Sequence, residues 1–216
     1  MRYPRRAFLA KVGLVGAIIG GVAIVPGVAL GARGKGISQV LPESVLTAVF
    51  RPTANDASVA ATINGEPVLQ RAVRQQAQLL QTQQSGLTGS AARKAAFRLV
   101  APDAAAYAEA RRRGLQVSQV DAQKFTDFQR NLYQQENPQE KLPTTVAIAS
   151  SGLAENIYWQ QQVSVYARGM LIGKLRQQVL ALNPLASPTQ QAQHWQDFLN
   201  SLVNSAHIVY IDKSLQ

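Results

Sequence analysis

Two short apolar runs stand at opposite ends of a long stretch in which apolar residues recur every three or four positions. The first run covers residues 58–63 and the second covers residues 207–212. Both are rich in β-branched or aromatic residues, which favour strands, so we expect them to pair as a small two-stranded sheet. In the stretch between the two runs, the spacing of the apolar residues is typical of amphipathic helices. The pattern therefore predicts a mainly α fold in which one small sheet joins the beginning of the domain to its end.

Start and stop signals divide the intervening stretch into helices. Gly65 can take a positive φ, and Pro67 has the fixed φ of a first helical turn, so a helix is expected to open at Pro67. Gly114 suits the position after a helix end, while Ser118 and Ser187 resemble helix N-caps. Together these signals predict helices over residues 67–84, 91–113, 119–135 and 151–182, and from 188 to the second strand.

Prolines are expected to interrupt the helical pattern at two places. Pro102 lacks a backbone N–H and disfavours helix at the residue before it, so the second helix is expected to be kinked or split in two. Residues 136–150 contain Pro138 and Pro143 and are expected to form a loop.

The helix expected over residues 151–182 carries two apolar seams, which change over near Gly169 and Gly173. A seam of this length needs several partner helices. The two seams consist of Trp159, Val163, Tyr166 and Met170, followed by Ile172, Leu175, Val179 and Leu182.

Residues 1–35 have a basic start and a charge-free run over residues 12–31, which is the pattern of an export segment. The start is similar to the twin-arginine signal, although Pro4 stands where Ser or Thr is usual. The run is long enough to anchor the chain in a membrane, and residues 29–32 form an acceptable cleavage site, so both outcomes stay open. In either case, residues 36–216 are expected outside the cytoplasm, in the periplasm or at the cell surface. The residues that carry the signal are Arg5, Arg6, Phe8 and Leu9.

Residues 36–57 contain Pro42 and Pro52 without a sustained apolar period, so they are expected to form a linker. The folded domain is then expected to comprise residues 58–216.

Charge and chemistry exclude several classes of protein. Six of the 22 basic residues lie in residues 1–35, which leaves 16 basic and 12 acidic residues for the rest, with no basic stripe that would suit a nucleic acid. Cysteine is absent, so disulfides and thiolate catalysis are excluded. The two histidines, His194 and His207, do not have metal-ligand spacing. No catalytic residue, metal ligand or cofactor is therefore expected.

Three segments carry a resemblance to a known family. Residues 61–68 (Ala-Thr-Ile-Asn-Gly-Glu-Pro-Val) resemble the first strand of the N-terminal chaperone domain of SurA-type periplasmic chaperones and PrsA-type foldases. Residues 109–121 resemble a helix junction of that domain, and residues 195–212 are similar to its closing helix and strand. The resemblance covers residues 57–212. In that family, prolyl isomerase activity resides in a separate parvulin domain before the closing helix, whereas only residues 183–187 stand there in this chain.

The resemblance implies an ATP-independent chaperone-like protein that binds non-native polypeptides and is not an enzyme. The alternative is a dedicated structural or assembly subunit, which uses the same fold to hold one partner in the cell envelope. Aromatic and Met side chains at helical spacing are candidates for a polypeptide-binding surface, although such residues more often lie in a core. The candidates are Phe128, Tyr133, Trp159, Tyr166 and Met170.

Overall fold

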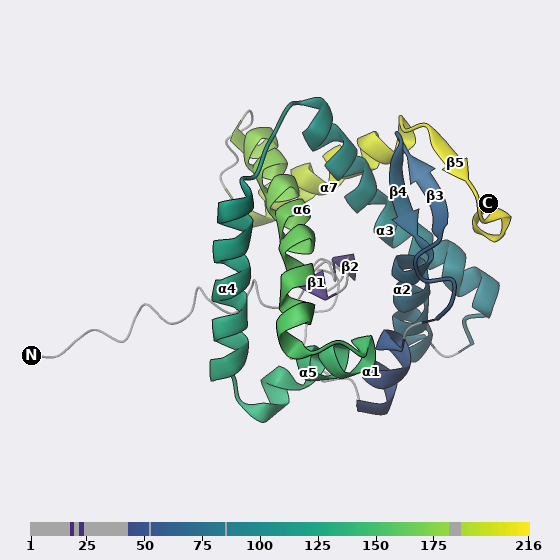
Figure 1. Ribbon diagram of the computed structural model, residues 1–216. Coiled ribbons are helices and arrows are strands. Elements are labelled where there is room, and N and C mark those ends of the chain that lie inside the picture. The colour runs from purple at the N-terminus through teal and green to yellow at the C-terminus, as the bar shows by residue number, and fades with distance from the viewer. Residues whose placement is uncertain (1–17, 20–21, 24–42, 52, 85, 182–186) are drawn as a thin grey trace, which may run out of the picture.

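The computed structural model describes residues 18–19, 22–23, 43–51, 53–84, 86–181 and 187–216. It is mainly helical with small antiparallel sheets, which confirms the predicted fold class (Figure 1). In chain order the elements are β1 (Ile18–Ile19), β2 (Val22–Ala23), α1 (Glu43–Phe50), β3 (Val59–Ile63), β4 (Glu66–Leu69), α2 (Gln70–Gln83), α3 (Gly89–Arg112), α4 (Gln119–Gln135), α5 (Pro138–Ser151), α6 (Glu155–Ala181), α7 (Pro188–Asn204), β5 (Ile208–Tyr210) and a 3-10 turn over Lys213–Leu215.

The twin-arginine-like residues lie outside the described residues. Among the residues that the structure describes, no helix has the length and apolar character needed to cross a membrane.

The expected pairing between the two ends of the domain is confirmed. β3 pairs antiparallel with β5, with Ile63 opposite Ile208 and Ala61 opposite Tyr210. The side chain of Asn64 supports this pairing, because its Oδ1 accepts a hydrogen bond of 2.8 Å from the backbone N–H of His207. The first and last parts of the domain therefore share one sheet.

The sheet has a third strand that the sequence analysis assigned to a helix. β4 pairs with the other side of β3, so the strand order is β4-β3-β5. Asn64 and Gly65 have φ values of 50° and 84°, which suit the two-residue turn of a hairpin better than a corner between a strand and a helix. Pro67 therefore lies in a strand and does not open α2. As β4 is an edge strand, a missing N–H is tolerated there.

Most of the other helix boundaries agree with the sequence. Pro102 lies inside α3, so that helix is one element and is not split. Gly114 follows α3 with φ 71°, and Ser118 caps α4 by accepting a 3.0 Å hydrogen bond from the N–H of Asp121. Ser187 and Gln190 form the expected capping box of α7.

The loop expected over residues 136–150 is wrong, because α5 occupies it. The Oδ1 of Asn137 accepts hydrogen bonds from the N–H groups of Gln139 and Glu140, at 3.1 and 3.0 Å, and completes a capping box with Glu140. Pro138 follows the cap at the first helical position, where it has no N–H to satisfy. The prolines that suggested a loop thus belong to a helix.

The two seams expected along α6 contact different partners, as predicted. In its first half, Tyr158, Trp159 and Tyr166 pack with α4 and α5. In its second half, Leu171, Leu175 and Val179 pack against α3 and α7. α6 consequently connects two groups of elements. We call β3–β5 with α2, α3 and α7 the sheet lobe, and α4, α5 and the first half of α6 the helical lobe.

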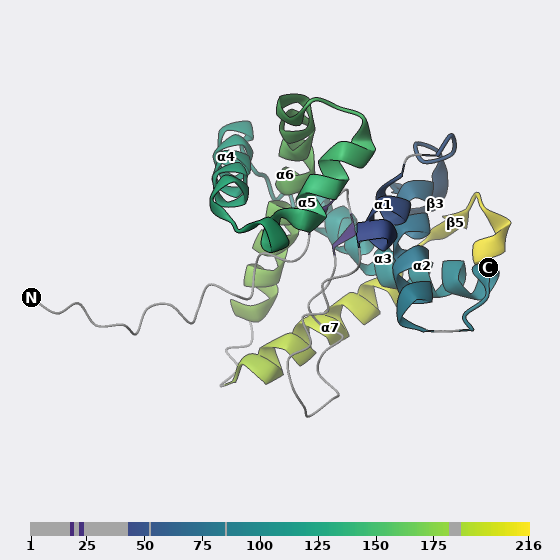
Figure 2. The same cartoon turned by 90° about the horizontal axis from the view of Figure 1, so that it is seen from below.

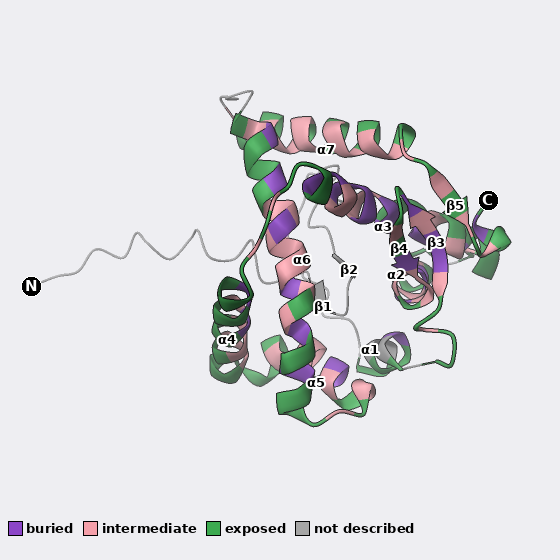
Figure 3. Cartoon of the chain, turned by 45° about the horizontal axis from the view of Figure 1, so that its top comes forward, coloured by how far each residue is buried: buried purple, intermediate pink, exposed green. Residues whose placement is uncertain are grey.

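α3 provides the centre of the sheet lobe, where its alanine-rich face is buried against the sheet and α2 (Figure 3). α1 contacts both α5 and α2, and so joins the two lobes on one side (Figure 2). β1 and β2 pair with each other, and they contact α6 and the α2–α3 pair, respectively. They therefore lie between the lobes (Figure 1).

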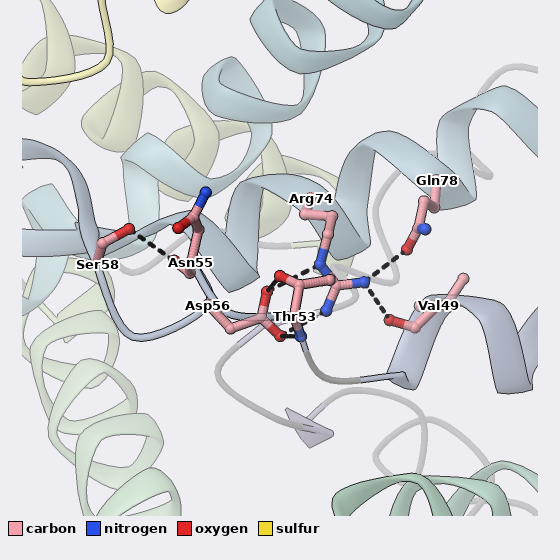
Figure 4. A network of polar contacts seen from close by, with 7 residues as sticks. All are labelled: Val49, Thr53, Asn55, Asp56, Ser58, Arg74 and Gln78. Atoms are coloured by element: carbon pink, nitrogen blue, oxygen red, sulfur yellow. Dashed lines mark hydrogen bonds and ion pairs between the residues drawn. The ribbon is translucent and has the colours of Figure 1, made fainter.

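Part of the segment expected as a linker is fixed to the sheet lobe. The guanidinium of Arg74 donates to both carboxylate oxygens of Asp56, at 2.9 and 2.7 Å, and to the carbonyl oxygen of Val49 in α1 at 3.0 Å (Figure 4). Thr53 donates to the same carboxylate from its N–H and its hydroxyl. The sheet lobe is thus joined to α1 and to residues before 58, because a polar network holds this segment.

Candidate functional site

The five residues proposed for a binding surface divide into core and surface. Trp159 is 5% exposed and Tyr166 is 9% exposed, so both belong to the core of the helical lobe. Their rings lie 5.7 Å from Tyr133 and 5.3 Å from Phe125 of α4. Burial raises the pKa of Tyr166 to about 12. The expectation that Trp159 and Tyr166 line a binding surface is corrected, since they hold α4 and α6 together.

The other three candidates are more accessible. Phe128 is 54% exposed on α4, while Tyr133 and Met170 are half-buried. The Tyr133 hydroxyl lies 3.2 Å from the hydroxyl of Thr145, which ties Tyr133 to α5. Of the five, only Phe128 offers most of its ring to a partner.

A pocket between the lobes brings together residues that are far apart in the sequence. It has a volume of about 330 Å³ and lies between β4, α2 and α3 on one side and α6 on the other. We call it the inter-lobe pocket. The described residues that line it are Pro67, Val68, Leu69, Arg71, Ala72, Val100, Asp103, Ala104, Tyr107, Ser164, Val165 and Arg168.

The sheet-lobe side of this pocket is largely apolar. Val68 of β4 and Val100 and Ala104 of α3 are buried members of the sheet-lobe core, and their outer surfaces reach the pocket. The edge strand β4 contributes Pro67 and Leu69 beside them. The hairpin turn and the continuous α3 position these groups, so the apolar surface is a direct product of the fold.

Charged groups also line the pocket. The guanidinium of Arg168 lies 4.3 Å from the ring centre of Tyr107, across the gap between α6 and α3. Burial raises the pKa of the Asp103 carboxyl, and the positive charge of Arg168 acts in the opposite direction. Burial also raises the pKa of Tyr158 on α6, against the positive charge of Arg71 on α2. Both arginines thus act across the space between the lobes.

The inter-lobe pocket was missed at the sequence level. Asp103 carried one weak signal, since it is one of only two carboxyls among the alanines of α3. Nothing local relates it to Arg168, which is separated from it by two complete helices. Only the packing of α6 on α3 brings the two together.

A second pocket of about 440 Å³ lies between α1 and α5, and its lining combines polar residues, among them Glu43, Arg51 and Ser150, with the apolar Leu142 and Val146. Among the described residues, no group of three or more His, Asp or Glu side chains is placed to hold a metal ion.

Comparisons with known proteins found no family model, no curated protein and no solved structure that matches this chain.

Proposed function

We propose that this protein is an extracytoplasmic, ATP-independent chaperone-like protein, without enzymatic activity, which holds non-native polypeptides in the crevice between its lobes. The observation that carries the proposal is the inter-lobe pocket, where apolar residues from β4 and α3 face α6 across an open space. Apolar surface with few fixed charge pairs suits partners of varied sequence. The resemblance to the SurA-type chaperone domain agrees with this reading.

The N-terminal strands give further support. β1 and β2 carry only apolar residues (Ile18, Ile19, Val22 and Ala23), and they contact α6, α2 and α3, which are the helices that border the pocket. Two short apolar strands thus lie beside the helices that border the pocket. A client segment has the same chemical character.

Light scattering of an unfolded protein diluted from denaturant tests the proposal. Residues 36–216 at near-equal molar ratio are expected to suppress aggregation. Val165→Asp places a charge in the inter-lobe pocket and is expected to abolish suppression, whereas Gln177→Asp changes an exposed position of α6 outside the pocket and serves as the matched control. Equal activity of the two variants would contradict the location of the site, and no suppression at several-fold excess would contradict general chaperone activity.

A dedicated assembly subunit is the second candidate, and the free edge of β5 favours it. In the described part of the chain, β5 pairs only with β3, so its other edge has no strand beside it. Val209 and Ile211 are 45% and 58% exposed next to this edge. Unpaired edge strands accept an added strand from a partner. If Val209→Lys abolishes a single cross-linked envelope complex while aggregation suppression is absent, this second function is supported.

A further inference from the structure

Arg71 and Arg168 line the inter-lobe pocket. They form no ion pair with a carboxylate, unlike most other arginines nearby. Arg111 also contacts the Tyr107 ring, at 6.0 Å, but it forms an ion pair of 2.5 Å with Glu66. Arg112 and Arg113 pair with Glu109 at 2.6 Å each. Within the described residues, neither Arg71 nor Arg168 forms an ion pair.

Asp103 is the one carboxyl among the described residues that line the pocket, and it forms no ion pair with either arginine. It lines the same pocket, but it makes neither an ion pair nor a side-chain hydrogen bond in the described structure. Burial raises the pKa of its carboxyl, and the positive charge of Arg168 lowers it. With two arginines and one aspartate, the lining of the pocket has a positive formal charge.

The Arg168 guanidinium is held in place while its charge stays available. It lies over the Tyr107 ring, an arrangement that leaves the N–H groups at the edge of the guanidinium plane free to donate. A planar fork of this kind suits the two oxygens of a carboxylate. Val68, Val100 and Ala104 provide apolar surface in the same pocket.

We propose that the inter-lobe pocket binds the carboxyl-terminal residue of a client polypeptide, with Arg168 and Arg71 contacting its carboxylate and the apolar wall contacting its side chain. This inference rests on the proposed function, since it names the part of the client that the same site selects. Charge complementarity supports it, because two guanidinium groups without an ion-pair partner and a single carboxyl line the pocket in the described structure.

A chain terminus fits this pocket better than an internal acidic residue. A volume of about 330 Å³ is near the lower end of the roughly 300–1,000 Å³ typical of small-ligand sites. A terminal apolar residue carries a carboxylate and an apolar side chain on one Cα, and so places both in this small space. With an internal Asp or Glu, the carboxylate and the apolar side chain belong to two different residues, and both residues have to enter the pocket.

Fluorescence anisotropy with the full-length chain tests the inference through three labelled peptides of one uncharged sequence. The first ends in Leu with a free carboxylate, the second ends in Leu amide, and the third is an amide with one internal Asp. The free acid is expected to bind about tenfold more tightly than either amide, because charge-assisted hydrogen bonds are stronger than neutral ones. This preference is expected to decrease in 0.5 M salt.

Variants separate recognition of the carboxylate from recognition of the peptide body. Arg168→Gln is expected to remove the preference for the free acid and to leave binding of the Leu amide unchanged. Arg71→Gln changes an exposed residue and gives a second variant if Arg168→Gln does not fold. Arg111→Gln is the matched control, because Arg111 contacts the same ring but is already paired with Glu66. It is expected to keep the preference.

The outcomes distinguish this inference from the function on which it rests. Equal binding of the free acid and the Leu amide would overturn carboxylate recognition, and the chaperone proposal would stand if aggregation is suppressed. Equal binding of the free acid and the internal-Asp peptide would overturn selection of the terminus. If no peptide binds and aggregation is not suppressed, both proposals are wrong.

Discussion

Arg74 shows how one side chain extends the folded domain beyond what the sequence predicts. Its guanidinium makes four hydrogen bonds, two to the Asp56 carboxylate, one to the Val49 carbonyl and one to the Gln78 side chain (Figure 4). Bidentate pairing of this kind is among the stronger polar interactions in proteins. It ties α1 and the residues after it to α2. Nothing in the composition of residues 36–57 signals this, because the partner lies in the next helix.

Replacing Arg74 with Met is expected to lower the free energy of unfolding by about 2 kcal/mol, because the Asp56 carboxylate loses its guanidinium partner and the Val49 carbonyl loses its side-chain donor. Urea denaturation measures the change. Arg98→Met is the matched control on α3, since Arg98 is exposed, and it is expected to change stability by less than about 0.5 kcal/mol. Equal effects of the two substitutions would show that the Arg74 network does not stabilise the fold.

The Asp56 carboxyl makes stability depend on pH. Burial alone would raise its pKa, but hydrogen bonds from Arg74 and Thr53 outweigh burial and lower the pKa from 3.8 to about 2. The unfolded chain therefore takes up the proton first as the pH falls. The stabilisation is fully present above the unfolded value and is lost as the pH falls through the folded value.

Comparison with Asp56→Asn isolates this effect from those of Glu109 and Asp212, whose pKa values are also lowered. At neutral pH the wild type is expected to be more stable than Asp56→Asn by about 1 kcal/mol, after allowance for solvent screening. The difference is expected to shrink between about pH 5 and pH 2. A difference that is constant over this range would refute the assigned role of the carboxylate.

At the scale of elements, α6 is the helix on which both lobes depend. Its first half joins α4 and α5 through aromatic residues, and its second half joins α3 and α7 through aliphatic residues. The sequence predicted this change of partner because the apolar spacing shifts near Gly169 and Gly173. A helix with two seams places its remaining faces, including Val165 and Arg168, towards the space between the lobes.

Leu175→Ala is expected to lower the free energy of unfolding by about 3 kcal/mol, because Leu175 is fully buried in the second seam and its loss leaves a cavity. Arg176→Ala, at the next position and exposed, provides the control. Thermal and urea unfolding measure both. A small effect at Leu175 would mean that the second half of α6 is not held by this seam.

The limits of the sequence analysis have local physical causes. The sequence predicted α4, α6 and α7 well, because their signals are local. Ser118 and Ser187 cap the helices that they begin, and the apolar period of α6 lies within that one helix. Proline was misread twice, because it is compatible with both a helix start and an edge strand: Pro138 opens α5, and Pro67 lies in β4. The choice between these depends on what precedes the proline, a cap at Asn137 in one case and a hairpin turn in the other.

At the scale of the whole molecule, the candidate site arises from packing between elements and not from a motif. The sequence predicted the sheet that joins the two ends of the domain, but two of its five candidates for a binding surface, Trp159 and Tyr166, are buried. It missed the approach of Arg168 to Tyr107 because the two residues belong to different helices. Polypeptide binding between the lobes is therefore a claim about tertiary structure, and it needs a test at specific positions.

Site-specific photo-cross-linking tests this claim most directly. A photoreactive amino acid at Ser164, an exposed residue that lines the inter-lobe pocket, is compared with the same amino acid at Gln177, an exposed residue of α6 outside it. The account predicts that an unfolded client is captured at position 164 and not at 177, and that the folded form of the same client is captured at neither. Equal capture at the two positions, or none at 164 while aggregation is suppressed, would contradict binding between the lobes.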